Sequence, residues 1–338
     1  MITRKITFTE SQRAELVEVE IPDEPGPDEI IVKTSRTLVS TGTELICFLG
    51  ECDEGTHWAS FSRWPHYPGY SALGTAIAVG DEVEGISVGQ RVCTTSNHSE
   101  YSVVPSDRIW GPSIPETISD DEAVWSILAV ITQTGVRQAE HVMGDRVVVI
   151  GLGPLGQLVV QYLRAMGMHE IVAIDMDQGR LDVALAHGAT AGLCGDVVDA
   201  KEFVLDQLNG ELADVVYDVT GHWAVLPLAL PLARDHGKMI LLGDSPFPSR
   251  QRLTDDVLSR QVTLIGSRSS WLPPAYSMWT PQRMAELFLT YLQRGAMRVA
   301  DLTSHTFAPQ ECGDVYSMLM ADRTSTLAVV YDWTRLEG

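Results

Sequence analysis

The sequence is poor in cysteine and has no long apolar run. Its 338 residues include five cysteines, an odd number with no CxxC pair, which argues against a disulfide framework and favours a reducing compartment. No segment approaches the roughly 18 apolar residues of a membrane helix, and the N-terminus lacks an apolar stretch of signal-peptide length. We therefore expect a cytoplasmic protein with no membrane partner.

Positive charge is also scarce. Lys and Arg number 24 against 45 Asp and Glu, which gives a formal net charge of −21. A surface this acidic repels phosphate backbones and anionic lipids, so nucleic acid is not an expected partner. The length and the 45% hydrophobic content suit two globular domains, each with a core of its own.

The N-terminal part, residues 1–122, is rich in extended segments. Stretches such as "EIIVKTSRTLV" and "GTAIAVG" are separated by Gly and Pro in "PDEPGPDE" and "YPGY". Short strands at close spacing predict a β-rich domain of barrel or sandwich type. The polar stretch "LVSTGTEL", residues 38–45, follows one such strand and is expected to be a turn.

Residues 123–267 alternate between apolar strands and helical patterns. Examples are the strands "DRVVVIGLG" and "EIVAIDMD" and the helices "PLGQLVVQYLRAMG" and "QGRLDVALAHG". This alternation predicts an α/β domain with a doubly wound parallel sheet. Residues 268–338 are expected to return to the first domain.

Two further helices are expected at less regular places. "SDDEAVWSILAVITQTGVRQAEHV" begins with Ser and acids and then shows helical spacing, so it predicts one capped helix. "WAVLPLALPLARDHG" is expected to be a helix interrupted by its prolines.

The clearest motif is a glycine-rich turn between a strand and a helix. Gly151, Gly153 and Gly156 form GxGxxG and enclose Pro154 and Leu155. The first glycine permits the tight turn, the second leaves room for a pyrophosphate, and the third lets the helix pack close to the strand. Free N–H groups at the helix N-terminus then favour phosphate. The motif predicts a dinucleotide site, although a tight turn without a ligand would look the same.

An acid follows at the spacing that such sites require. Asp175 ends the next strand, where its carboxylate would bond the ribose hydroxyls and repel a 2′-phosphate, so NAD is favoured over NADP. Arg180 is a candidate for adenine or phosphate, or a surface helix residue. The remaining candidates for the cofactor cleft are Thr134, Thr220, Gly243, Gly266 and Ser267.

Three local patterns give the whole chain a family likeness. "VGDEVEGISVGQRV", "HSEYSVVP" and "GDRVVVIGLGPLG" resemble the corresponding segments of the medium-chain dehydrogenase/reductase superfamily. The resemblance implies a GroES-like catalytic domain joined to a Rossmann domain, hydride transfer to a nicotinamide, and a homodimer or homotetramer.

The departures from that family concern its zinc ligands. The family's ligand motif "CGTD" reads "TGTE" here, so Thr41 takes the place of the cysteine. Its "GHE" reads "PGYS", with Tyr70 for the histidine, and the third ligand position falls near Val130. Catalytic zinc requires three nitrogen, sulfur or carboxylate ligands, so we expect no zinc. Cys93 stands alone where the family's structural zinc would lie. An unrelated metal site is a minor alternative at Cys47, Cys52 and His57.

Without zinc, side chains must hold the reacting oxygen and relay its proton. By resemblance, Thr43 occupies the start of the family's proton relay, and Thr41 and Tyr70 would surround the oxygen. Glu44 and His98 are the nearby carboxylate and imidazole. Each also has a structural interpretation: the threonines as turn caps, Glu44 as a cap or ion pair, Tyr70 as packing, and His98 as a turn residue.

The leading hypothesis is an NAD-dependent, zinc-independent dehydrogenase of a secondary alcohol, most readily a sugar or polyol. "STGTE" and "PGY" also resemble bacteriochlorophyllide 3-hydroxyethyl dehydrogenases, which act on a hydroxyethyl-tetrapyrrole. A quinone or enoyl reductase and a non-catalytic nucleotide-binding protein remain open alternatives. Aromatic residues of two segments are candidates for a substrate contact, a core or an interface: Trp58, Phe61, Trp64 and Tyr67, and the stretch 269–279.

Overall fold

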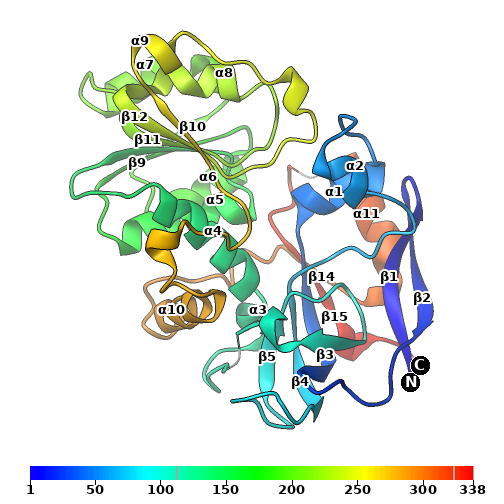
Figure 1. Cartoon of the computed structure of the whole chain (residues 1–338). Coiled ribbons are helices and arrows are strands. Elements are labelled where there is room, and N and C mark those ends of the chain that lie inside the picture. Colours follow the sequence, from blue (N-terminus) through cyan, green and yellow to red (C-terminus); the bar gives the residue numbers. More distant parts are fainter. Residues whose placement is uncertain (112, 323, 338) are drawn as a thin grey trace. The chain divides into compact units, whose positions relative to one another are not determined.

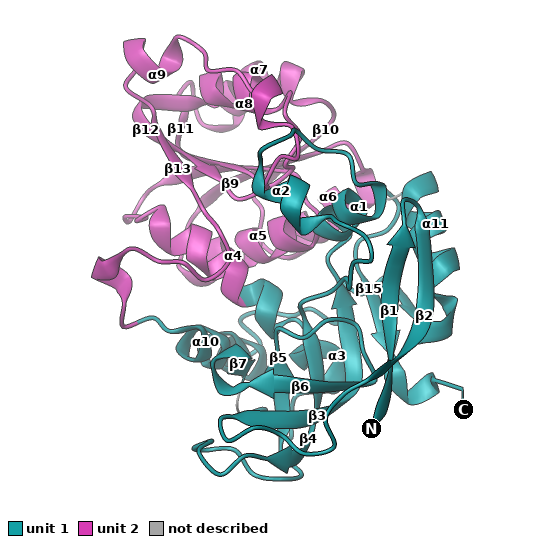
Figure 2. Ribbon diagram, turned by 45° about the vertical axis from the view of Figure 1, so that its right-hand side comes forward, with its two compact units in different colours: residues 1–129, 279–338 teal, residues 130–278 magenta. Residues whose placement is uncertain are grey.

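The computed structural model describes residues 1–111, 113–322 and 324–337. The chain forms two compact units, shown in Figure 2: unit 1 comprises Met1–Ala129 and Trp279–Gly338, and unit 2 comprises Val130–Met278. The sequence pattern placed the changes of domain at residues 122/123 and 267/268. The division into units falls inside helix α4 (Ser126–Gln138) and before helix α10 (Pro281–Gln293).

Unit 1 is built on β structure. A seven-stranded sheet has the order β14-β15-β3-β4-β5-β7, and β6 also pairs with β3; β1 and β2 form a separate antiparallel pair. The strands of unit 1 are β1 (Ile2–Glu10), β2 (Arg13–Glu20), β3 (Glu29–Val39), β4 (Ala72–Val79), β5 (Arg91–Thr94), β6 (Tyr101–Pro105), β7 (Ile109–Gly111), β14 (His305–Phe307) and β15 (Val329–Asp332). Because β15 pairs antiparallel with β3, the C-terminal return completes the sheet that the N-terminal part begins.

Four further helices belong to unit 1 along with α10: α1 (Thr41–Leu49), α2 (His57–Phe61), α3 (Asp120–Ala123) and α11 (Cys312–Ala321). The turn expected at residues 38–45 was wrong, because this stretch ends β3 and opens α1. Burial of Leu45 and Phe48 stabilises this helix more than its composition does, since Gly42 and two threonines are poor helix formers. Gly50 ends the helix in the left-handed conformation, with φ 69°.

Unit 2 contains the doubly wound sheet that the sequence predicts. Its six parallel strands have the order β10-β9-β8-β11-β12-β13, the order of two joined mononucleotide-binding halves. They are β8 (Arg146–Ile150), β9 (Glu170–Asp175), β10 (Ala191–Cys194), β11 (Ala213–Asp218), β12 (Ala233–Leu241) and β13 (Thr263–Gly266). The other helices are α5 (Pro154–Ala165), α6 (Gln178–Ala186), α7 (Ala200–Gln207), α8 (Leu226–Ala229) and α9 (Asp256–Ser259). In Figure 1, α5 and α6 cover one face and α7 and α8 the other.

Two helix predictions require correction. The single helix expected from residue 119 onward is two helices, α3 and α4; Ser119 forms a capping box with Glu122 at the first of them. The proline-rich segment 223–237 is helical only over α8 and a short 3₁₀ turn, after which β12 already begins at Ala233. Pro227 and Pro231 occupy first-turn positions, so they start short helical turns without extending either.

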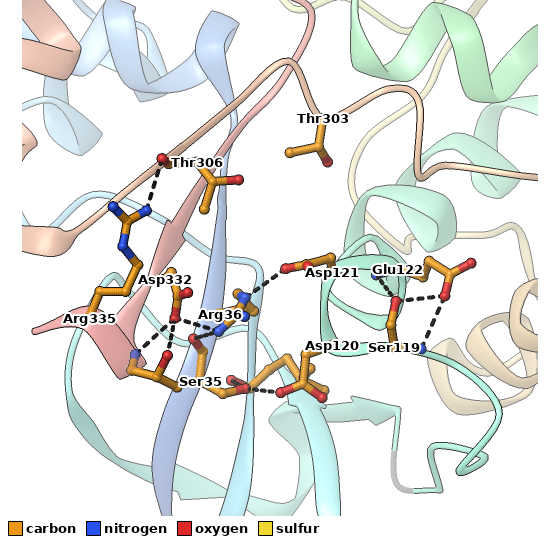
Figure 3. A network of polar contacts seen from close by, with 12 residues as sticks. Ser35, Arg36, Ser119, Asp120, Asp121, Glu122, Thr303, Thr306, Asp332 and Arg335 are labelled. Atoms are coloured by element: carbon orange, nitrogen blue, oxygen red, sulfur yellow. Dashed lines mark hydrogen bonds and ion pairs between the residues drawn. The ribbon is translucent and has the colours of Figure 1, made fainter.

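A polar network joins distant parts of unit 1 (Figure 3). The Arg36 guanidinium on β3 donates to Asp121 in α3 at 2.6 Å and to Asp332 at the end of β15 at 2.5 Å. Ser35 donates to Asp120 at 2.7 Å beside it. The network therefore ties the C-terminal return to the first sheet strand and to α3. No helix among the described residues has both the length and the apolar character needed to cross a bilayer.

Candidate functional site

The candidate catalytic residues of unit 1 gather around the first turn of α1. Glu44 is 1% exposed, and its carboxylate accepts three hydrogen bonds. Oε1 accepts from the Ser40 backbone N–H at 2.7 Å. Oε2 contacts His98 Nε2 at 3.0 Å and accepts from the Tyr316 hydroxyl at 2.5 Å. Glu44 thus joins the end of β3, the segment before β6 and helix α11.

His98 lies wholly inside unit 1, with no exposed side-chain surface. Its Nε2 faces the Glu44 carboxylate, whereas its Nδ1 has no hydrogen-bond partner among the described residues. Because a carboxylate oxygen only accepts, the hydrogen bond at this contact runs from His98 Nε2–H to Glu44 Oε2.

Three hydroxyl groups lie close together beside the Ser40 backbone N–H that bonds Glu44. The Tyr70 hydroxyl donates to Ser40 Oγ at 2.5 Å and lies 3.4 Å from Thr43 Oγ1. Ser40, Thr43 and Tyr70 are all half-buried. We call this set the hydroxyl cluster. Thr41, also half-buried, has no side-chain hydrogen bond in the described structure, so its hydroxyl remains separate from the cluster.

The hydroxyl groups of the two tyrosines in this region, Tyr70 and Tyr316, have raised pKa values. Burial raises the pKa of Tyr70, and its hydrogen bonds with Ser40 and Thr43 oppose that rise only in part. Burial also raises the pKa of Tyr316 well above its ordinary value, and the nearby Glu44 charge raises it further. Both side chains are therefore phenols at neutral pH and act as hydrogen-bond donors.

Close backbone approach fixes the position of His98. Gly69, directly before Tyr70, has φ 91°, and a Cβ built there would lie 2.8 Å from the His98 ring. Only glycine fits both this conformation and this contact. The "PGY" stretch therefore holds His98 from one side while Glu44 holds it from the other.

In unit 2, the glycine-rich turn has the geometry that its motif predicts. Gly151 has φ 89°, and a Cβ on Gly156 would lie 2.0 Å from the Gly151 carbonyl oxygen. A Cβ on Gly153 would meet nothing within 4 Å, so space remains where a pyrophosphate would approach. Gly153 is the N-cap of α5 and Pro154 and Leu155 lie in its first turn, which leaves free N–H groups at the turn.

Asp175 is held beside this turn by backbone donors. Its Oδ2 accepts from Leu152 N–H at 2.6 Å and its Oδ1 from Asp177 N–H at 2.9 Å. Each oxygen keeps a second lone-pair site for a ligand hydroxyl. Gln157 bonds the carbonyls of Leu152 and Arg180 at 3.1 and 2.8 Å, which ties the turn to α6.

Most of the other candidate cofactor residues lie at the carboxyl ends of strands in this sheet, whereas Thr134 lies in helix α4. Thr220 follows β11, and its methyl group lies so near Gly151 that a Cβ built on that glycine would be 2.8 Å from it. Gly243, after β12, lies against the Gly221 backbone so closely that any Cβ would clash. Gly266 ends β13, and the Ser267 hydroxyl is buried without a partner in the described structure. Thr134 in α4 is buried and donates to its own helix, at the Val130 carbonyl.

The chain is similar in sequence to known dehydrogenases. A family model described as "Zinc-binding dehydrogenase" matches residues 154–280. L-threonine 3-dehydrogenase from Pyrococcus furiosus is 26% identical over 328 residues, which cover 87% of this chain and 88% of that protein. These matches bear out the resemblance to the medium-chain dehydrogenase/reductase superfamily. The predicted class of enzyme, a dehydrogenase, is confirmed by the sequence relatives.

Solved structures of the superfamily share the fold. An Escherichia coli structure described as a short chain alcohol dehydrogenase (rspB) complexed with NADH superposes with a TM-score of 0.82 at 22% identity, covering 98% of this chain and 99% of that one. Galactitol-1-phosphate dehydrogenase from Escherichia coli has a TM-score of 0.83 at 18% identity, covering 97% and 99%. The predicted fold, a GroES-like domain with a Rossmann domain, is confirmed.

Two residues that complete the unit 1 site are not among the predicted site residues. Ser40 stands in "STGTE" beside predicted residues, but nothing in the sequence indicates its hydrogen bond with Tyr70. Tyr316 has no local signal, because it lies in an apolar helix far along the chain. Of the four aromatic residues in the loop before Tyr70, Trp58 is buried, and the other three are exposed: Phe61, Trp64 and Tyr67.

Proposed function

We propose that this superfamily member oxidises a secondary alcohol, with a sugar or polyol as the leading class, using NAD and no zinc. The observation that carries the proposal is the hydroxyl cluster of Ser40, Thr43 and Tyr70, anchored on buried Glu44. It lies where zinc-dependent relatives would carry ligands. The glycine-rich turn and Asp175 support NAD as the cofactor.

NAD is the cofactor that the residues of unit 2 fit. The turn from Gly151 to Gly156 would take the pyrophosphate, and Asp175 the adenosine ribose. When bound, the nicotinamide supplies the hydride acceptor for the alcohol carbon. Because the Asp175 carboxylate repels a 2′-phosphate, NADH should bind more tightly than NADPH in a fluorescence titration. Tighter NADPH binding would contradict this assignment.

The residues at the expected metal positions do not fit zinc. Thr41 and Tyr70 offer neutral hydroxyls, and Val130 offers no donor. Among the described residues, no three His, Cys, Asp or Glu side chains converge on one point. Metal analysis of protein purified without chelators should give well under one equivalent of zinc, and a full equivalent would overturn the metal-free proposal.

The hydroxyl cluster provides a way to hold the substrate oxygen. The Tyr70 hydroxyl donates its hydrogen bond to Ser40 Oγ, so the Ser40 hydroxyl hydrogen is left to donate to a substrate oxygen. Thr43 supports the Tyr70 hydroxyl from the other side. Preorganised donors of this kind stabilise charge that develops on oxygen during the reaction.

The test of function is a screen with NAD across sugars, polyols and hydroxyethyl-tetrapyrroles, followed by absorbance of the reduced nicotinamide. Turnover of a sugar or polyol, lost by about 10²-fold or more in Tyr70→Phe, is the expected result. Quinone or enoyl turnover instead would point to a reductase. NAD binding without any turnover would point to a non-catalytic protein. Unchanged turnover in both Thr43→Val and Glu44→Gln would contradict the site.

For the assembly, we propose a homodimer or homotetramer, as the superfamily resemblance implies. Strand β13 forms one edge of the unit 2 sheet, so its outer backbone groups are open to pairing with a second copy. Light scattering coupled to size-exclusion chromatography should give a multiple of the 37.1 kDa chain mass. A monomer at micromolar concentration would contradict this.

A further inference from the structure

Tyr316 enters the unit 1 site from the C-terminal return of the chain. Its ring is fully buried in α11, with an edge-to-face contact to Phe8 at 4.7 Å and a stacked contact to Phe48 at 5.3 Å. These contacts require only an aromatic ring. The hydroxyl is different, because it donates to Glu44 Oε2 at 2.5 Å. A phenylalanine would fill the same space without the cost of burying a hydroxyl.

The Tyr316 hydroxyl is connected to the hydroxyl cluster through a short series of hydrogen bonds. Tyr316 holds Glu44 Oε2, and Glu44 Oε1 holds the Ser40 backbone N–H at 2.7 Å. The Ser40 side chain in turn accepts from Tyr70 at 2.5 Å. A backbone amide does not pass protons along, so this series transmits position and not a proton.

We propose that Tyr316 is a positioning residue for the reaction: its hydroxyl fixes the Glu44 carboxylate, and through it the Ser40–Tyr70 pair. This inference rests on the proposed function. It assigns a role to the C-terminal return of the chain, from which Tyr331 also contacts the His98 ring, at 5.3 Å between centroids.

His98 alone would leave the carboxylate less well defined. Without the Tyr316 hydroxyl, Oε2 would keep one donor, His98, and Oε1 would keep the Ser40 N–H; the second donor on Oε2 restricts the carboxylate further. Glu44 also lies in the first turn of α1, where its Oε1 takes the place of a capping side chain for the Ser40 N–H. Loosening the carboxylate would therefore loosen the start of the helix that carries Thr43.

The first test compares two single-atom deletions. Tyr316→Phe removes the hydroxyl that bonds Glu44, and Tyr217→Phe, in unit 2, removes a buried hydroxyl that bonds His141 at 2.7 Å. Both should lower the melting temperature. Only Tyr316→Phe should lower kcat, by about 10- to 100-fold, with the NAD dissociation constant unchanged. Equal kcat in Tyr316→Phe and wild type would overturn the proposal.

A double-mutant cycle tests whether the effect passes through Tyr70. If Tyr316 acts by positioning that residue, Tyr70→Phe/Tyr316→Phe should lose no more kcat than Tyr70→Phe alone. Full additivity of the two losses would mean that Tyr316 acts by another route and would overturn the proposal.

A third readout requires no substrate. Hydrogen–deuterium exchange in a peptide that covers Ser40 should be faster in Tyr316→Phe and Glu44→Gln than in wild type or Tyr217→Phe. Unchanged exchange would overturn the positioning role. If wild type turns over no alcohol at all, the proposed function fails, whereas the exchange experiment still decides whether Tyr316 holds this turn.

Discussion

Each unit contains a buried cluster of a histidine, a carboxylate and a tyrosine, and the hydrogen bonds within the two clusters are arranged differently. In unit 1 the carboxylate is the central group, because Glu44 bonds His98, Tyr316 and the Ser40 backbone. In unit 2 the histidine is the central group, because His141 bonds Asp145 through Nδ1 at 3.1 Å and Tyr217 through Nε2 at 2.7 Å.

This difference in hydrogen bonding suits the unit 2 cluster to a structural role and the unit 1 cluster to a functional one. His141 has a partner on both ring nitrogens, and Asp145 also accepts from Val142 N–H at 3.0 Å, so this cluster closes on itself and fixes the turn before β8. That turn precedes the strand, at the edge opposite the glycine-rich turn. In unit 1 the bonds continue from Glu44 to the half-buried hydroxyl cluster. A buried polar cluster that leads toward the surface is therefore the better functional candidate.

Removing the two carboxylates should give the largest effects and the clearest contrast. Glu44→Ala leaves His98 and Tyr316 buried without their acceptor, and we expect a loss of about 3–5 kcal/mol in the free energy of unfolding. Activity should fall below detection. Asp145→Ala should also destabilise the protein but leave kcat near wild type in the folded fraction. Urea unfolding and steady-state kinetics measure the two, and a similar loss of kcat in both variants would remove the distinction.

The backbone approach to His98 can be tested with a matched pair of glycines. Gly69→Ala puts a Cβ 2.8 Å from the His98 ring at φ 91°, whereas Gly55→Ala adds a Cβ at φ 79° with nothing within 4 Å. Both carry a backbone cost of about 1 kcal/mol. Gly69→Ala should cost about 1–3 kcal/mol more and lower kcat, because the ring must shift away from Glu44. Equal stability of the two variants would mean that His98 moves freely.

The unit 2 cluster should make stability depend on pH. Burial lowers the pKa of His141, and the hydrogen bond and charge of Asp145 oppose that shift only in part. Lys238 also faces it and lowers the pKa, while Asp214 raises it. The unfolded chain then binds a proton more readily than the folded one. The contribution is fully present above the ordinary histidine pKa of about 6.5 and is lost as pH falls below it, at up to about 1.4 kcal/mol per pH unit.

His141→Gln isolates this dependence. Unfolding free energies measured between pH 7.5 and 5 should fall less steeply in the variant than in wild type. An unchanged slope would show that another group carries the pH dependence. The kcat of the variant at pH 7.5 should equal that of wild type, because the cluster closes on itself.

The nucleotide turn was predictable because its properties are local. Gly151, Gly153 and Gly156 act through the backbone of one short segment, and Asp175 follows at a fixed distance, so four positions define the site. Glu44, the central residue of the unit 1 cluster, has its partners at residues 40, 98 and 316. Resemblance placed Glu44 and His98 in one region, but nothing in the sequence brings Tyr316 to them. Helix α1 was misread for a related reason: burial of Leu45 and Phe48, not propensity, makes it a helix.

The network of Figure 3 should show the smallest effect, because its residues are more exposed than those of the two buried clusters. Arg36 is 17% exposed and Asp332 12%, but Asp121 is 57% exposed. In Arg36→Gln, Asp332 keeps its bonds from Thr334 N–H and Oγ1, so no buried acceptor is left unpaired. We expect a loss of about 1 kcal/mol that shrinks at high salt, and no change in kcat. Arg13→Gln breaks fully exposed ion pairs with Glu10 and Glu15 and should not change stability measurably. If Arg36→Gln lowered the free energy of unfolding as much as Glu44→Ala, the stabilisation by these networks would not depend on how exposed their residues are.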